Sequence, residues 1–308
     1  MGFFLCDNAR MKNVREFNRI LFRWHKKHYR PMPWRPKTRA ARVRLDPYRI
    51  LVSEIMLQQT QVDRVRGKYA GFLRKFPTVW ALARAPLGEV LRVWSGLGYN
   101  RRAKYLHLSA KKVFKEHKGK FPDTFEELVK LPGVGISTAG ALLAFSFGQD
   151  VAMVDTNIRR ILVRSFFPPK ADPPLAGTRG RERPSDKKLY AFAASIIPKG
   201  KGRMWNYAML DLGATLCSAR NHKSECPLTP LHGEVGDFVH KKPQKKFAGS
   251  HRFYRGSLLA VLSQKKRVAE TELPRFLGLK AEATRSLVAA LEQEGLLIRR
   301  GAFVMLPG

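Results

Sequence analysis

Two carboxylates occupy local surroundings that could divide the work of acid catalysis between them. Glu54 lies in the apolar segment ILVSEIML, where a buried carboxyl has a raised pKa and can donate a proton near neutral pH. Asp155 ends an apolar run and opens a helical pattern, so that it would cap the helix and be kept ionised by the helix dipole. Cleavage of a glycosidic bond needs such a pair, because an acid serves the leaving group and an anion faces the oxocarbenium-like sugar.

Both residues also have structural explanations. Glu54 can point outward from its helix, which the helical period partly permits, and Asp155 can be an N-cap and nothing more. Local sequence leaves these alternatives open.

A third feature is the turn Leu131-Pro132-Gly133-Val134-Gly135, which lies between two helical patterns. Two glycines around one apolar residue allow a tight turn and a close approach of backbone N–H groups to a ligand. Beside a helix N-terminus that ligand is expected to be a phosphate, although such a turn is often only structural.

These residues must be positioned by helices. Asp46-Pro47 is a strong helix start, with Asp46 as N-cap and Pro47 at the first helical position, ahead of Ile50–Leu57. Amphipathic patterns predict further helices from residue 14 and over residues 63–75, 86–94, 101–117, 123–130, 136–147, 156–166, 189–197 and 204–216. Residues 168–188 are rich in proline, glycine and charge, and are predicted to be a flexible insertion.

The C-terminal part is predicted to be a separate small domain. Helical patterns over 257–263, 270–276 and 281–295 precede a hairpin-like alternation over 296–306, which is the order of a winged helix. A plain helical cap is the alternative. We therefore expect domains at 12–228 and 252–308, joined by a basic linker at 229–251.

The composition favours a polyanionic partner. The 308 residues include 58 Lys and Arg against 24 Asp and Glu, a net charge of +34, which gives the surface a positive field. No apolar run is long enough to span a membrane and no signal peptide is recognised, so that a cytoplasmic, nucleoid-associated location is expected. Three cysteines are too few for a disulfide scaffold.

Several segments together resemble the helix-hairpin-helix DNA glycosylase superfamily, and within it the MutY-type adenine-DNA glycosylases, over residues 14–228. The resemblance is carried by Pro33-Trp34-Arg35, Asp46-Pro47-Tyr48, SEIMLQQTQV (53–62), FPTVWALARAPLGEVLRVWSGLGY (76–99), KFPDTFEELVKLPGVGISTAGALL (120–143), VDTNIRRIL (154–162) and MLDLGA (209–214). It implies a mainly α, two-lobed glycosylase fold, followed here by the winged-helix-like domain.

The resemblance also implies roles for individual residues. Glu54 matches the acid that protonates adenine, Asp155 the aspartate that stabilises the sugar cation, and Asn157 a polar residue that supports this arrangement. Gln59 and Thr60 match a loop that enters the duplex, and Leu97 and Tyr99 match residues that probe the opposite base or wedge the stack. Target bases leave the stack for such chemistry, so wedge residues are expected. The expected DNA-binding residues are Gln59, Thr60, Leu97, Tyr99, Gly133, Val134, Gly135, Trp34, Arg35 and Arg159.

Ser137 stands where related enzymes with lyase activity carry a lysine. A serine has no amine and cannot form a Schiff base with the sugar. The resemblance therefore implies a monofunctional glycosylase, without strand cleavage.

The chain departs from the family in two places. Relatives commonly hold a four-iron four-sulfur cluster on four cysteines, of which only Cys217 and Cys226 remain, so that the cluster is predicted to be absent. A zinc site of Cys217, His222, Cys226 and His232 is the alternative to a metal-free loop. The C-terminal part is also too short for the domain with which such enzymes recognise 8-oxoguanine.

The sequence predicts a monomeric glycosylase that acts on double-stranded DNA with a mismatched or damaged base pair, and removes adenine opposite 8-oxoguanine or guanine. The alternatives are removal of thymine or uracil opposite guanine, and a non-catalytic DNA-binding protein on the same scaffold. The presence of both Glu54 and Asp155 argues against the last.

Overall fold

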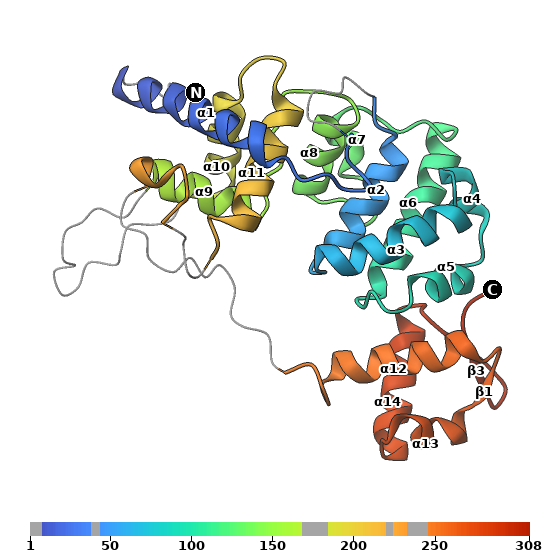
Figure 1. Cartoon of the computed structure of the whole chain (residues 1–308). Coiled ribbons are helices and arrows are strands. Elements are labelled where there is room, and N and C mark those ends of the chain that lie inside the picture. The colour runs from blue at the N-terminus through green and yellow to red at the C-terminus, as the bar shows by residue number, and fades with distance from the viewer. Residues whose placement is uncertain (1–7, 38–43, 168–183, 220–223, 233–245) are drawn as a thin grey trace. The chain divides into compact units, whose positions relative to one another are not determined.

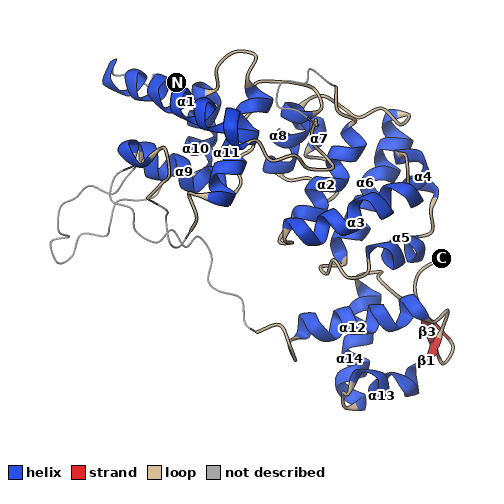
Figure 2. Cartoon of the chain, viewed as in Figure 1, coloured by secondary structure: helices blue, strands red, loops and turns tan. Residues whose placement is uncertain are grey.

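The computed structural model describes residues 8–37, 44–167, 184–219, 224–232 and 246–308, and these are mainly helical (Figures 1 and 2). Most of the predicted 168–188 insertion and much of the predicted 229–251 linker lie outside the described residues. The described helices before residue 232 are α1 (Asn8–His28), α2 (Pro47–Leu57), α3 (Val62–Lys75), α4 (Val79–Arg84), α5 (Leu87–Trp94), α6 (Arg101–His117), α7 (Phe125–Leu128), α8 (Ile136–Phe145), α9 (Thr156–Phe166), α10 (Asp186–Ile196), α11 (Gly202–Thr215) and the 3₁₀ turn η1 (Thr229–Leu231).

Segments distant in sequence combine into two compact units. Unit 1 consists of Met1–Leu45 and Ile136–Lys242, and unit 2 of Asp46–Gly135 and Pro243–Gly308. The predicted boundaries at 12–228 and 252–308 follow the sequence instead and stay a prediction.

Unit 1 is built around α8, whose sequence ISTAGALLAF is apolar on nearly every side. Such a helix has no polar face for solvent and is stable only when it is surrounded. Thr138 and every residue from Ala139 to Phe145 are accordingly buried. A polar tie adds to this core, since Asn18 accepts a hydrogen bond from Trp205 Nε1 at 3.0 Å and donates to the Ile196 carbonyl at 2.8 Å.

Unit 2 begins as the sequence predicts. The Asp46 side chain accepts the Tyr48 backbone N–H at 2.9 Å, and Pro47 occupies the first helical position of α2. Phe72 and Trp94 are fully buried, with their rings at 83° to one another and 6.0 Å between centroids. Helix α4, which was not predicted, packs on α6 and is capped by Thr78, whose hydroxyl accepts from Ala81 N at 3.1 Å.

The C-terminal domain contains α12 (His251–Gln264), β1 (Val268–Ala269), η2 (Glu270–Glu272), α13 (Leu273–Leu277), α14 (Ala281–Gln293), β2 (Ile298–Arg300) and β3 (Phe303–Met305). The three helical segments and the hairpin confirm the winged-helix order. Two details differ from the prediction: α12 begins six residues earlier, where Ser250 caps it, and the short strand β1 completes an antiparallel sheet of order β1-β3-β2.

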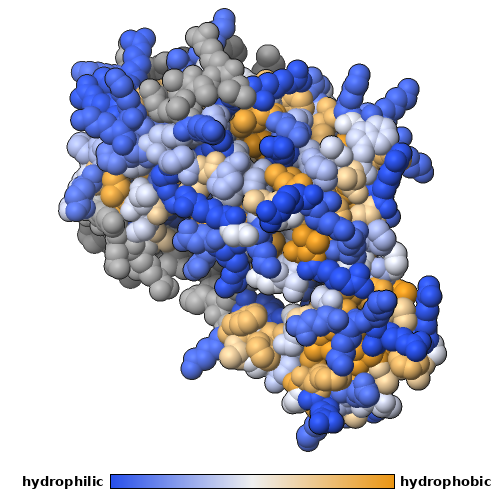
Figure 3. Space-filling view, turned by 45° about the vertical axis from the view of Figure 1, so that its right-hand side comes forward, coloured by the Kyte–Doolittle hydropathy of each residue, from blue (hydrophilic) through white to orange (hydrophobic). Residues whose placement is uncertain are grey.

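The surface carries many hydrophilic side chains, whereas apolar side chains gather on the C-terminal domain (Figure 3). Its exposed aromatic residues include Phe247, Phe253 and Phe276. No helix among the described residues is long and apolar enough to cross a membrane.

Candidate functional site

Asp155 is the N-cap of α9, as the sequence predicts. Its Oδ1 accepts the backbone N–H groups of Asn157 at 2.9 Å and Ile158 at 2.8 Å, while its Oδ2 accepts from the Asn157 side chain at 3.0 Å. These bonds satisfy donors that the helix leaves unpaired. The carboxylate is therefore held in one orientation.

Two opposing effects act on the ionisation of Asp155. Burial raises the pKa of this carboxyl above its ordinary value, and the hydrogen bonds from Ile158 and Asn157 and the charge of Arg160 act in the opposite direction. The cap therefore favours the ionised form, as expected, against the cost of desolvation, and the ionisation of Asp155 stays a prediction.

The segment that presents Asp155 is clamped from three helices of unit 1. Asn206 on α11 accepts from Met153 N at 2.9 Å and donates to the Val151 carbonyl at 2.8 Å. Tyr190 on α10 donates to the Val154 carbonyl at 3.0 Å. A side chain at Gly140 on α8 would stand 2.8 Å from the Ala152 carbonyl oxygen, so that only glycine allows this approach.

Asn157 links Asp155 to the end of α11. Its Oδ1 accepts from Arg160 at 2.8 Å, and Arg160 also donates to the carbonyls of Gly213 at 2.7 Å and Cys217 at 2.6 Å. A Cβ at Gly213 would lie 2.6 Å from Asn157 Cβ, which explains the glycine at this position. The predicted supporting role of Asn157 is consistent with this geometry and stays a prediction.

Ser137 lies in the first turn of α8 and is partly buried. It shares a hydrogen bond with the hydroxyl of Tyr190, whose pKa burial raises to about 12. Tyr190 is also within electrostatic range of Asp155. Sequence reasoning missed Tyr190 and Asn206, since neither stands in a recognisable motif and only the tertiary fold brings them to residues 151–155.

Glu54 belongs to unit 2 and lies on α2. Its neighbours Val52, Ser53, Ile55 and Met56 are buried, and Glu54 itself is partly buried. The carboxyl is therefore neither solvated like a surface group nor fully enclosed. Its assignment as the acid stays a prediction.

Three loops of unit 2 carry the other expected DNA contacts, and Arg102 ties two of them together. From α6 this buried guanidinium donates to the carbonyls of Ile55 at 3.0 Å and Met56 at 2.8 Å, and to Thr60 Oγ1 at 2.9 Å. It donates equally to the carbonyls of Leu97 at 3.2 Å and Gly98 at 3.0 Å.

Burial lowers the pKa of Arg102 to about 10, which leaves it charged at neutral pH. The sequence offered no signal for this role, because a charged residue in an amphipathic helix is ordinarily solvated. Gln59 and Tyr99, at the tips of the two loops that Arg102 joins, have positive φ angles of 57° and 48°. A positive φ is unusual for such residues and is typical of functional loops.

The third loop is the glycine turn. Gln58 Nε2 donates to the Gly133 carbonyl at 3.4 Å, and Ser109 donates to the Pro132 carbonyl. Gly133 has φ of 78°, and a Cβ there would lie 2.8 Å from Tyr105 Cβ. Gly135 is exposed, with open space where a Cβ would stand. The chain itself therefore requires Gly133 but not Gly135, whereas Val134 is buried.

The remaining predicted contacts have partners inside unit 1. Arg35 donates to Asp211 Oδ1 at 2.8 Å and Oδ2 at 3.0 Å, beside His25 at 3.2 Å from the same carboxylate. Trp34 is buried as well. Arg159 pairs with Asp186 at 2.6 Å. The structure gives Arg35 and Arg159 structural partners, and their contact with DNA stays a prediction.

Two of the four residues of the predicted zinc site, Cys217 and Cys226, lie inside the fold. Both are buried, and Arg164 donates to Cys217 Sγ at 3.3 Å. The hydrogen bond from Cys226 and the charge of Arg164 lower the pKa of Cys217 to about 6. No group of three or more His, Cys, Asp or Glu side chains able to hold a metal occurs among the described residues, which do not include His222.

A chain with three cysteines cannot supply the four thiolates of a conventional four-iron cluster. The residues present therefore do not fit that group. The zinc alternative stays a prediction.

Comparison with known proteins gives a consistent picture. Residues 52–179 match the family model of the HhH-GPD superfamily base excision DNA repair protein. The adenine DNA glycosylase of Mycobacterium tuberculosis is 35% identical over 263 residues, which are 83% of this chain and 80% of that protein. The adenine DNA glycosylase of Homo sapiens is 38% identical over 71% of this chain, and that of Buchnera aphidicola 34% identical over 73%. The matched regions are 39% of the human protein and 59% of the Buchnera protein.

Solved structures of DNA glycosylases are similar in fold to this chain. A thermostable thymine-DNA glycosylase superposes with a TM-score of 0.62 at 29% identity, over 73% of this chain and 97% of that one. A trapped endonuclease III–DNA covalent intermediate gives a TM-score of 0.56 at 22% identity over 71% of this chain and 93% of that one, a likeness of fold alone.

Proposed function

The chain belongs to the HhH-GPD superfamily of base excision DNA repair proteins, and we propose that it is a monofunctional DNA glycosylase that removes adenine from mismatched or damaged base pairs. The observation that carries the proposal is the fixed carboxylate of Asp155 at the N-terminus of α9, supported by Asn157 and Arg160. The substrate is double-stranded DNA, to which the net charge of +34 draws the protein. We expect it to act as a monomer on nucleoid DNA.

The proposed chemistry divides hydrolysis between two acids. Glu54 donates a proton to a ring nitrogen of adenine, and the glycosidic bond breaks with its electron pair leaving on the base. Asp155, ionised, stabilises the positive charge that develops on the sugar. Water then adds to the sugar carbon and releases a proton, which leaves an abasic site. Since Ser137 has no amine, no covalent Schiff base forms and the strand stays intact.

A second candidate target is thymine or uracil opposite guanine. The thymine-DNA glycosylase of known structure favours it, because that chain is 29% identical and matches over 97% of its length. The identities of 34–38% to adenine DNA glycosylases favour adenine.

The two candidates are separated by a single-turnover assay with enzyme in excess. The duplexes contain adenine opposite 8-oxoguanine, adenine opposite guanine, and thymine or uracil opposite guanine, with alkali added to cleave abasic sites. We expect adenine release, and strand breaks only after alkali. Release of pyrimidines alone contradicts the adenine target, and breaks without alkali contradict the Ser137 argument.

A further inference from the structure

The C-terminal domain contacts the rest of unit 2 through backbone as well as side chains. The Gly88 N–H at the start of α5 donates to the Pro307 carbonyl at 2.8 Å, and a Cβ at Gly88 would lie 2.5 Å from that oxygen. Helix α12 packs on α5 in the same region. The tail that the sequence predicts to be separate is therefore closely packed within this unit.

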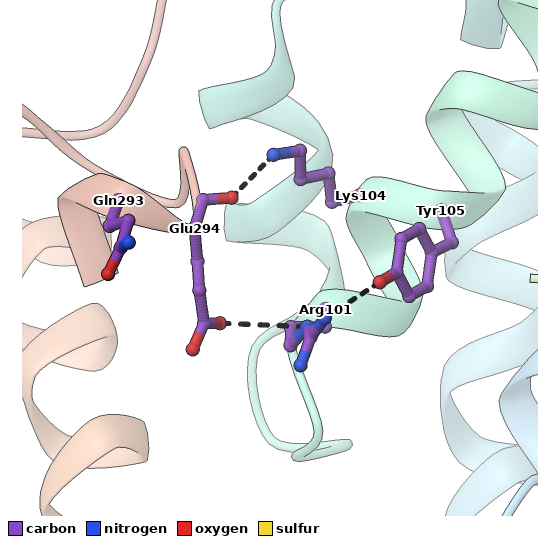
Figure 4. Close-up of a pocket in the computed structure, with 5 residues that line it drawn as sticks. All are labelled: Arg101, Lys104, Tyr105, Gln293 and Glu294. Carbon is purple, nitrogen blue, oxygen red and sulfur yellow. Dashed lines mark hydrogen bonds and ion pairs between the residues drawn. The ribbon is translucent and has the colours of Figure 1, made fainter. Parts of the chain in front are cut away.

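A polar seam joins α14 to α6 (Figure 4). Lys104 donates to the Glu294 carbonyl, and Arg101 Nε lies 3.8 Å from a carboxylate oxygen of Glu294. The same carboxylate accepts two hydrogen bonds from Arg255 of α12, at 2.8 and 2.6 Å. With Tyr105 and Gln293, Arg101, Lys104 and Glu294 line a cavity of ≈ 250 Å³. These contacts fix the N-terminal half of α12 beside the N-terminus of α6.

Tyr99 lies two residues before the start of α6, and arginine side chains from two helices contact it. Arg102 places its guanidinium 5.4 Å from the centroid of the ring, and Arg252 of α12 donates to the hydroxyl at 3.0 Å. The residue remains 37% exposed. Both Gly98 and Tyr99 have a positive φ, of 73° and 48°. Such a backbone is strained at Tyr99, so that contacts of its side chain are needed to stabilise this loop conformation.

We propose that Arg252 is a positioning residue for Tyr99. Through this contact the C-terminal domain determines which base the enzyme prefers opposite the target base. The proposal rests on the proposed function and on the expectation, implied by the resemblance, that Tyr99 probes the opposite base or wedges the stack. Arg252 fixes the orientation of the Tyr99 phenol. This orientation decides against which opposite bases the edge of the ring packs without a clash. Specificity is a difference of affinities, which a small change in this orientation alters.

The alternative is that the domain only adds a general electrostatic grip on DNA. In that case the loss of Arg252 weakens binding to every duplex by the same factor, because phosphate contacts carry no base information.

The two possibilities are separated by dissociation constants for duplexes that carry a stable abasic-site analogue opposite 8-oxoguanine, guanine or cytosine. The variants are Arg252→Met, Tyr99→Phe and the double variant. Arg275→Met on α13 is the matched control, since it removes an exposed charge from the same domain. Thermal unfolding confirms that all variants are folded.

We expect Arg252→Met and Tyr99→Phe each to change the ratio of dissociation constants between opposite bases by about fivefold. This corresponds to about 1 kcal/mol, the net contribution of one ordinary hydrogen bond, because the bond between Arg252 and Tyr99 is exposed to solvent. The double variant should change it no further, because both substitutions remove the same contact. Arg275→Met should leave the ratio as in the wild type.

An unchanged ratio in Arg252→Met, or effects of the two substitutions that multiply in the double variant, overturns the proposal. The assay needs no excision and therefore reports on Arg252 independently of catalysis. A protein that discriminates between opposite bases through Arg252 but releases no adenine contradicts the proposed function alone.

Discussion

At the scale of single residues, the balance around Asp155 matters most. Three hydrogen bonds orient its carboxylate, while burial raises the pKa above the ordinary aspartate value. An anion that is poorly solvated in the free enzyme interacts more strongly with a developing positive charge, because the local dielectric constant is low. In the proposed mechanism, this environment destabilises the ion until the sugar cation forms beside it.

This balance has a consequence for the pH dependence of excision. The reaction needs ionised Asp155, and its raised pKa means that the ionised fraction falls as pH decreases through a value above the ordinary 3.8. We therefore expect the single-turnover rate to decline, as the pH is lowered, well before pH 3.8 is reached. Measurement under conditions in which circular dichroism shows a folded protein tests this. A rate that stays constant down to about pH 4 contradicts it.

The residues that perform the proposed chemistry could be predicted, whereas those that hold them could not. Asp155 can be recognised from the local sequence, because capping depends on neighbours two and three residues away. Asn206 and Tyr190 act on residues 36 to 55 positions distant, and Arg102 acts on a loop 42 positions away. Such bonds depend on the packing of helices, which periodicity does not specify.

At the scale of elements, the two glycines of the glycine turn meet different requirements, one of the fold and one of the predicted phosphate contact. Gly133 serves the fold, because of its φ of 78° and its contact with Tyr105. Gly135 meets nothing within the chain and is exposed. Its lack of a side chain is explained if a phosphate approaches its backbone N–H.

Alanine substitutions distinguish these roles. Gly133→Ala should lower the stability by about 1–3 kcal/mol, since it combines backbone strain with a steric clash. Gly135→Ala should leave thermal unfolding nearly unchanged but weaken the binding of duplex DNA by about threefold or more, because the added methyl group obstructs the phosphate. Calorimetry and binding titrations measure both. A Gly135→Ala variant with undiminished affinity contradicts the predicted phosphate contact.

Elements with strong local signals were predicted well. The predicted helix at 156–166 coincides with α9, and the Asp46-Pro47 start is confirmed at α2. Strand β1 was missed because it has two residues and exists only by pairing with β3. Helix α12 was predicted too short because the basic residues Arg252 and Arg255 flank Phe253 and Tyr254 in its first turns and obscure the apolar period.

At the scale of the whole molecule, charge is the dominant property. The 58 Lys and Arg outnumber the 24 Asp and Glu, so that a net charge of +34 remains even if every acidic side chain pairs with a basic one. The excess has a function if the partner is a duplex whose counterions are released on binding.

The salt dependence of duplex binding measures this directly. We expect the logarithm of the association constant to fall against the logarithm of salt concentration with a slope of about −4 or steeper. A titration series at several salt concentrations, with mismatched and matched duplexes in parallel, provides the measurement. A slope near zero for both would mean that the positive charge is not used on DNA.

The most direct test of the account is the rate of adenine release by Asp155→Asn under single-turnover conditions. Asparagine keeps the acceptor that caps α9, so that the variant should fold like the wild type. The account predicts a rate at least about 100-fold lower, with the dissociation constant for the same duplex within about tenfold, because only stabilisation of the sugar cation is lost. Adenine release at the wild-type rate by the folded variant would contradict the role of Asp155 and with it the proposed mechanism.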